Sequence, residues 1–160
     1  MGSGTILREV LAAAELLEAD FGVLADVWSV TSFTELRREG VEIDRWNTLN
    51  PLAKQPKVPY VTTQLKGRQG PVVASTDYIR SYPEMIRAWV PGDYRVLGTD
   101  GFGRSDFRKA LRSFFEVDRH HVVVSALKAL ADDGVIPMKQ VADAIKRYEI
   151  DPAAPMPTTV

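Results

Sequence analysis

The stretch Tyr94-Arg-Val-Leu-Gly-Thr-Asp-Gly-Phe-Gly-Arg-Ser-Asp106 is the most informative about the fold class, because it joins two kinds of local structure. Its first residues, Tyr94 to Gly98, are apolar and β-forming and predict a short strand. Residues 99–106 form a polar, glycine-rich loop, and the helical apolar spacing that follows predicts a helix over 106–117. A strand that leads through a loop into a helix is the repeating unit of an α/β domain.

The segments on either side extend this pattern. The run Pro71-Val-Val-Ala-Ser75 is short and apolar and predicts a buried parallel strand. Ala25 to Phe33 is rich in β-branched and aromatic residues and also predicts a strand. Helical spacing and capping residues predict further helices over 6–19, from about 34, from about 82, over 118–133 and after Pro137. We expect Gly40 to end or interrupt the helix that starts near residue 34, and a single helical turn at 60–65 within an irregular segment over 50–70.

Alternating strands and helices predict a three-layer α/β domain, with a mostly parallel sheet covered by helices on both faces. In such a fold a strand should precede the first helix, and Met1 would be its last residue. We therefore expect that this first strand is truncated and that the chain was cut from something longer. The domain should cover residues 1–150, followed by a frayed tail over 151–160 that contains three prolines and no periodicity.

The amino-acid composition excludes several classes of binding partner and of catalytic chemistry. The chain has 160 residues and 17.8 kDa, enough for one domain. Lys and Arg total 20 against 21 Asp and Glu, so no global positive field would hold nucleic acid or an anionic membrane. The absence of cysteine excludes disulfides, thiolate-ligated metals and thiol catalysis. No apolar run approaches the ~20 residues of a membrane helix and no secretory signal is visible, which predicts a soluble, cytoplasmic protein.

Two glycine-containing motifs are candidates for ligand binding. Gly2-Ser3-Gly4-Thr5 stands at a helix start, where free N–H groups can bind an anion, although a plain strand-to-helix turn explains it as well. Asp100-Gly-Phe-Gly-Arg-Ser-Asp106 stands where α/β sheets place ligands. Within it Arg104 could pair with a carboxylate or phosphate, or with its neighbouring aspartates, and Phe102 could anchor the loop to a neighbouring domain.

Other polar groups favour structural roles. His120 and His121 are adjacent, and neighbouring helical residues point about 100° apart, so the pair is badly placed to ligate one metal. The sequence contains no Gly-x-Ser-x-Gly nucleophile elbow. The local basic patch formed by Lys54, Lys57, Lys66 and Arg68 is more typical of a solvated loop than of a nucleic-acid groove. The residues by themselves therefore indicate an α/β domain without a self-contained active site.

Several motifs together resemble the C-terminal domain of the homodimeric bacterial pyruvate dehydrogenase family, which belongs to the transketolase-like superfamily. In chain order these are Asp26-Val-Trp-Ser-Val-Thr-Ser-Phe-Thr-Glu-Leu36, Ala74-Ser-Thr-Asp-Tyr78, the stretch from Tyr94 to Asp106, Phe115-Glu-Val-Asp118 and Val141-Ala-Asp-Ala-Ile145. The resemblance runs collinearly from Gly2 to Asp151. It implies a small, mostly parallel sheet with one antiparallel strand and flanking helices.

The resemblance also implies where the chemistry lies. In this family thiamine diphosphate and its divalent metal, Mg, lie between the other two domains across the dimer interface, together with the general acid/base histidines. The Gly-Asp-Gly…Asn motif for metal and diphosphate is missing here, so we expect no catalytic, cofactor-binding or metal-binding residue in this chain. The parent enzyme, an oxidoreductase, would decarboxylate pyruvate and reductively acetylate the lipoyl group of an acyltransferase component.

Two hypotheses follow. In the first, this is a non-catalytic domain that packs against the rest of the parent enzyme and against the homodimer partner, while the basic patch contacts the dihydrolipoyl acyltransferase component. In the second, it is an autonomous α/β module that binds an anion, an effector or a partner. The candidate interface or loop residues are Tyr78, Trp89, Asp100, Phe102, Gly103, Arg104 and Ser105. No nucleic acid and no membrane is expected as a partner.

Overall fold

A small parallel sheet forms the centre of the computed structural model, which describes residues 1–159. Strands β1 (Val72–Ser75) and β2 (Tyr94–Leu97) pair in parallel, from Val72 opposite Tyr94 to Ser75 opposite Leu97. Gly2 extends this sheet through parallel bridges to Ser75 on one side and to Ser29 on the other. The Met1 amine and carbonyl bond to β1, and the Gly2 amide and carbonyl bond to the segment over 28–30. The spatial order is therefore 28–30, 1–3, β1 and β2.

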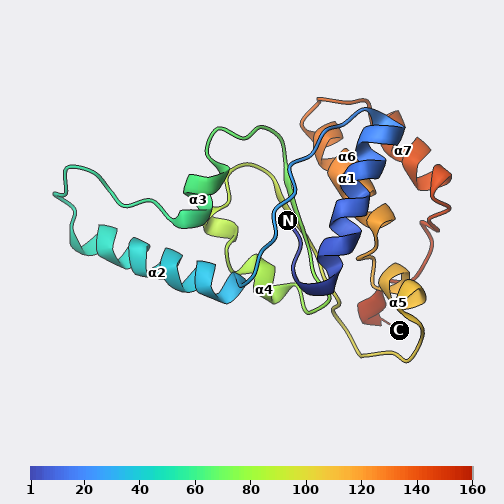
Figure 1. Cartoon of the computed structure of the whole chain (residues 1–160), viewed down its shortest axis with the longest axis horizontal. Helices are drawn as coiled ribbons and strands as arrows, with labels where there is room; N and C mark the ends of the chain where they lie inside the picture. The colour runs from blue at the N-terminus through green and yellow to red at the C-terminus, as the bar shows by residue number, and fades with distance from the viewer. Residues whose placement is uncertain (160) are drawn as a thin grey trace.

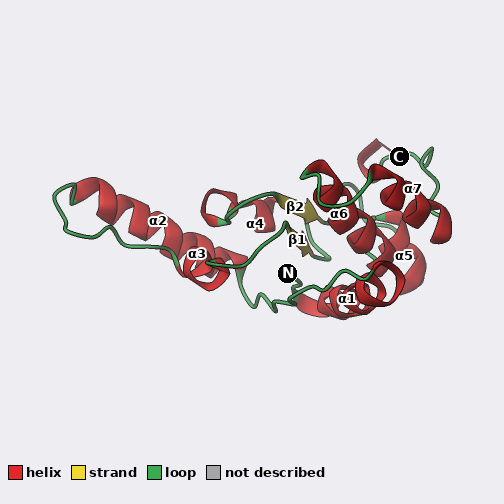
Figure 2. Cartoon of the chain, turned by 90° about the horizontal axis from the view of Figure 1, so that it is seen from above, coloured by secondary structure: helices red, strands yellow, loops and turns green. Residues whose placement is uncertain are grey.

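Helices surround the sheet (Figures 1 and 2). The longest are α1 (Leu7–Phe21), α2 (Phe33–Leu49), α6 (Arg119–Asp132) and α7 (Met138–Arg147). Shorter α-helices are α3 (Tyr60–Leu65), α4 (Ser81–Glu84) and α5 (Arg108–Phe114). Single 3₁₀ turns occur at η1 (Gly4–Ile6), η2 (Arg87–Trp89) and η3 (Pro157–Thr159). Within residues 1–159, no helix is both long and apolar enough to cross a membrane.

The pleat of the strands sends alternate side chains into two different cores. On one face, Ala74 and Val96 belong to a hydrophobic cluster with residues of α2 and α3. Ile86 and Val90, which flank η2, belong to the same cluster. On the other face, Val73 and Leu97 pack against a cluster built from α1, α6 and α7. Leu127 and Val123 of α6 have no exposed surface there. This arrangement confirms the three-layer α/β class, because helices cover both faces of a parallel sheet.

Most expected elements are confirmed, and the capping chemistry explains their starts. The Ser32 hydroxyl accepts a hydrogen bond from the Glu35 amide at 3.2 Å and caps α2, as the sequence pattern predicts. The Asp118 carboxylate accepts from the His121 amide at 3.0 Å and caps α6. These two caps satisfy amide donors that the first helical turn leaves unpaired.

Two expectations are wrong. The predicted strand over Ala25–Phe33 is a mostly irregular extended segment whose sheet pairing is the single bridge at Ser29. Gly40 does not interrupt α2, which continues to Leu49. The helix needs glycine there because a Cβ atom on residue 40 would stand 2.7 Å from the indole ring of Trp89. Beyond this contact α2 projects away from the body of the molecule, and the chain returns beside it to α3 (Figure 1).

The structure also differs from three further expectations. The helix expected from about Tyr82 is divided into α4, which contains Pro83, and η2, with the break at Met85 and Ile86. All strand pairings among residues 1–159 are parallel, so the antiparallel strand implied by the resemblance is not found there. In the segment predicted to fray, η3 lies beside the glycine-rich loop, and Pro157 is buried.

Candidate functional site

The carboxyl ends of the strands bring together the two glycine motifs. The turn at Gly4 and Thr5 lies beside the loop that follows β1, and the Thr5 hydroxyl donates to the Asp77 carboxylate at 2.8 Å. The loop that follows β2 is fixed to the same region, because the Thr99 amide donates to the Tyr78 carbonyl at 3.0 Å. In parallel α/β sheets this end of the strands is the usual place for ligands. The structure therefore makes one region of two motifs separated by about a hundred residues.

A cavity of about 460 Å³ lies between these motifs and α5. Of the seven candidate residues, Gly103 and Arg104 line this cavity. The guanidinium carbon of Arg104 lies 4.7 Å from the centre of the Phe114 ring, so part of its interaction is with an aromatic face. Arg108 and Arg112 line the cavity as well, and neither was a candidate from the sequence. The recurrence of arginine every four residues, at 104, 108 and 112, was the available signal.

Asp100 supports the loop that it belongs to. Its carboxylate accepts a hydrogen bond from the Arg80 amide at 2.8 Å and lies 3.6 Å from the Arg80 guanidinium. Ser105 is exposed. Phe102 stands at the tip of the same loop with 87% of its surface exposed. The loop is thus anchored at its start and presents an aromatic ring to the surroundings at its tip.

Tyr78 and Trp89 lie apart from the cavity and are both half-buried. The Tyr78 hydroxyl donates to the Ser3 hydroxyl at 2.8 Å and ties the first turn to the β1 loop. The Trp89 indole N–H donates to the Asp44 carboxylate at 2.9 Å and fixes α2 against η2. Both aromatic side chains therefore have structural contacts within this chain.

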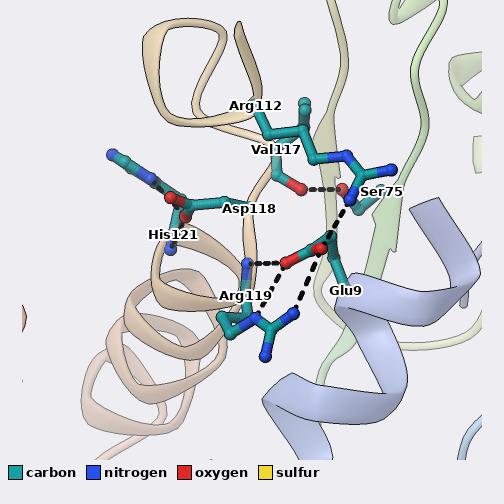
Figure 3. A network of polar contacts seen from close by, with 7 residues as sticks. All are labelled: Glu9, Ser75, Arg112, Val117, Asp118, Arg119 and His121. Atoms are coloured by element: carbon teal, nitrogen blue, oxygen red, sulfur yellow. Dashed lines mark hydrogen bonds and ion pairs between the residues drawn. The ribbon is translucent and has the colours of Figure 1, made fainter. Parts of the chain in front are cut away.

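A buried ion network shares Arg112 with the lining of the cavity. Figure 3 shows the side chains of this network. The Glu9 carboxylate, 7% exposed, lies 2.8 Å from an Arg112 nitrogen and 2.9 Å from Arg119 Nε. The Arg119 amide also donates to it, at 3.2 Å. Burial acts to raise the pKa of the Glu9 carboxyl, but the hydrogen bonds from Arg119 and the charges of both arginines outweigh burial and hold the pKa below its usual range. This network joins α1 to α5 and α6, and sequence reasoning missed it because its members lie more than 100 residues apart.

The histidines are used in packing and capping. His121 Nδ1 lies 2.8 Å from the Asp118 carboxylate, and the His120 ring stacks on Tyr148 at 4.5 Å between centres. Burial acts to raise the pKa of Asp118, but hydrogen bonds from His121 outweigh it and lower the pKa. In the described part of the chain no three His, Asp or Glu side chains converge as metal ligands. The residues over 1–159 therefore present no acidic set of the kind that a magnesium–diphosphate site needs.

Comparisons with known proteins identify relatives of this chain. The sequence profile of the transketolase-like TK C-terminal domain matches residues 1–118. Over 153 residues, 95% of this chain, it is 64% identical to the pyruvate dehydrogenase E1 component of Pseudomonas aeruginosa. It is 56% identical to the E1 components of Cupriavidus necator, over 100% of the chain, and of Escherichia coli K12, over 94%. The chain spans only 17–18% of the length of these three relatives.

Proposed function

Because this chain belongs to the transketolase-like C-terminal domain family, we propose that it is the non-catalytic C-terminal domain of a thiamine-diphosphate-dependent pyruvate dehydrogenase component. The parent enzyme would act in the cytoplasm, decarboxylate pyruvate and pass the acetyl group to the lipoyl group of the acyltransferase component. The identity of 64% along 95% of the chain carries this proposal. Thiamine diphosphate and Mg would be held by the remaining domains.

The domain would contribute packing and part of a homodimer interface. Phe102 and Phe107 stand 87% and 68% exposed on the loop that leads into α5. Exposed aromatic residues are common anchors of protein interfaces, because burying a rigid ring gains much apolar contact at little entropic cost.

A domain exchange tests the proposal. The matching region of the Pseudomonas aeruginosa E1 component would be replaced by this chain, and pyruvate-dependent acetylation of a lipoyl domain measured. We expect the exchanged enzyme to be a dimer whose activity is comparable to that of the unmodified Pseudomonas aeruginosa enzyme. The same enzyme truncated before this region should lose activity at least about 100-fold, because displaced domains misplace the reacting groups. A truncated enzyme as active as the parent, or a folded but inactive exchange enzyme, would contradict the proposal.

Replacing Phe102 by Ala in that exchanged enzyme should weaken dimerisation about 30-fold, the equivalent of roughly 2 kcal/mol for an interface anchor. Affinity for thiamine diphosphate at saturating protein should change much less, because the cofactor would bind elsewhere. Analytical ultracentrifugation gives the dimer constant. Val135→Ala is the matched control, since Val135 is 67% exposed on the turn between α6 and α7. An unchanged dimer constant for Phe102→Ala would remove this residue from the interface.

A further inference from the structure

The cavity at the carboxyl ends of the strands is lined by three different segments of the chain. One wall comes from the first turn, one from the loops after β1 and β2, and one from α5 and the residues that follow it. Its lining residues with a charge are Arg104, Arg108, Arg112 and Asp77. A volume of about 460 Å³ lies within the range of about 300–1,000 Å³ that small-molecule sites occupy.

The charges in the cavity are unbalanced, although the whole chain has a net charge of -1. Among residues 1–159, Arg104 and Arg108 form no ion pair. Arg112 is compensated from behind by Glu9. The single carboxylate of the lining, Asp77, accepts the Thr5 hydroxyl. The cavity therefore holds an excess of positive charge that the described residues leave unneutralised.

The spacing of these arginines makes the excess mildly unfavourable for the folded chain, by about 0.2–0.5 kcal/mol for a like-charged pair. Arg108 and Arg112 stand four residues apart on α5, so they share one face of the helix, and like charges at this spacing repel. Arg104 adds a third positive charge to the lining of the same cavity. A bound anion would remove this repulsion, since it would accept hydrogen bonds from several guanidinium groups at once.

The glycine-rich loop leaves room for such an anion. Gly101 has a φ of +102°, and a Cβ atom there would stand 2.9 Å from the Pro157 carbonyl oxygen, so the loop is held against η3 at this residue. Gly103 is different, because a Cβ atom on it would meet nothing within 4 Å. The loop is thus fixed at Gly101 and open at Gly103, and both glycines line the cavity.

We propose that this cavity binds the phosphate group of a small phosphorylated molecule. A phosphate has several acceptor oxygens arranged in a tetrahedron, which suits guanidinium groups that belong to different segments. This proposal does not depend on the pyruvate dehydrogenase assignment, because it follows from the cavity alone and is tested on the 160-residue chain.

The test is a calorimetric titration of the chain with inorganic phosphate at constant ionic strength, with chloride as the reference anion. We expect saturable binding of phosphate that Arg108→Gln weakens at least about tenfold, the loss expected for a charge-assisted hydrogen bond. Arg104→Gln should have a similar effect and serves as a second variant if Arg108→Gln fails to fold. The matched control is Lys109→Gln, which removes the same charge from the same helix at an exposed residue outside the cavity.

Three outcomes would overturn the proposal. The first is the absence of saturable phosphate binding to the unmodified chain. The second is an equal loss in Lys109→Gln and Arg108→Gln, which would show a general charge effect. The third is succinate binding as tightly as phosphate, which would assign the cavity to carboxylates, including acidic side chains of another domain. Tighter phosphate binding than succinate binding, lost in both arginine variants and kept in Lys109→Gln, would support it.

Discussion

Raising the pH from 5 to 8 should stabilise a chain with a free Met1 amine by about 3 kcal/mol, on the scale of 1.36 kcal/mol per pKa unit. The amine lies in the sheet and donates to the Val73 carbonyl at 2.7 Å. Burial lowers its pKa from an ordinary 8.0 to about 5, because the charged form loses its hydration. Between these two values the unfolded chain binds the proton and the folded chain does not. Stability is therefore lowest below pH 5 and fully regained above pH 8.

Urea unfolding at a series of pH values measures this effect. The control is the N-acetylated chain, in which an amide N–H can still donate to Val73 but carries no titratable charge. Acetylation should flatten the pH dependence over this window while the fold persists. If stability depends on pH equally in the acetylated chain and in the chain with the free amine, another group is responsible for the titration. If stability is independent of pH in both chains, the amine is hydrated in the folded state.

Removing both arginines of the Glu9 network, in Arg112→Gln/Arg119→Gln, should destabilise the chain by about 3–5 kcal/mol at pH 7, the usual effect of leaving a buried charge without its partners. Glu9→Gln alone should have a smaller effect, about 1–3 kcal/mol, because it removes the charge and leaves polar partners that can reach water. Adding Glu9→Gln to the double variant should therefore recover part of the lost stability. Urea unfolding of the four chains gives the comparison.

The pH dependence separates this account from a simple loss of packing. In the unmodified chain the pKa of Glu9 is lowered from its ordinary value of 4.5. Its contribution to the free energy of unfolding is therefore present above pH 4.5 and is lost as the pH falls through the pKa of the folded chain. In the double variant the hydrogen bond from the backbone amide of residue 119 remains, but both guanidinium groups are gone. Burial should then outweigh that single donor and raise the pKa of Glu9, so stability should instead fall as the pH rises through 4.5. Arg38→Gln, which removes one partner of an exposed pair with Glu35, should leave stability nearly unchanged. An unchanged direction of the pH dependence in the double variant would contradict the assigned role of Glu9.

These predictions concern features that could not be reached from local patterns. Hydrophobic spacing located α1, α6 and α7, and the Ser32 and Asp118 caps located two helix starts, because these signals involve residues within one or two turns. The composition of Ala25–Phe33 predicted a strand that the structure does not form, since β-propensity depends on neighbours that the segment lacks beyond Ser29. The break expected at Gly40 was wrong because the close approach of Trp89, 49 residues later, uses that glycine.

The candidate site, too, was only partly predictable from local sequence patterns. The loop around Phe102, Gly103 and Arg104 was predictable, because a glycine-rich segment between a strand and a helix is a local signal at a known place in α/β folds. Its neighbour in the cavity, Thr5, could not be assigned to it, since no local pattern relates residues separated by more than 90 positions. The Phe102 ring likewise needed the structure to show that it faces outward.

Motifs and interactions within short windows of the sequence are enough to predict the parallel α/β class, most of the helices, the two caps and the family. The three-dimensional packing was needed to show that the first turn, the β2 loop and α5 line one arginine-rich cavity, and that Glu9 is buried between two arginines. The physical reason is that the sheet aligns the carboxyl ends of its strands. Side chains far apart in sequence then share a small volume, where burial and charge decide their chemistry.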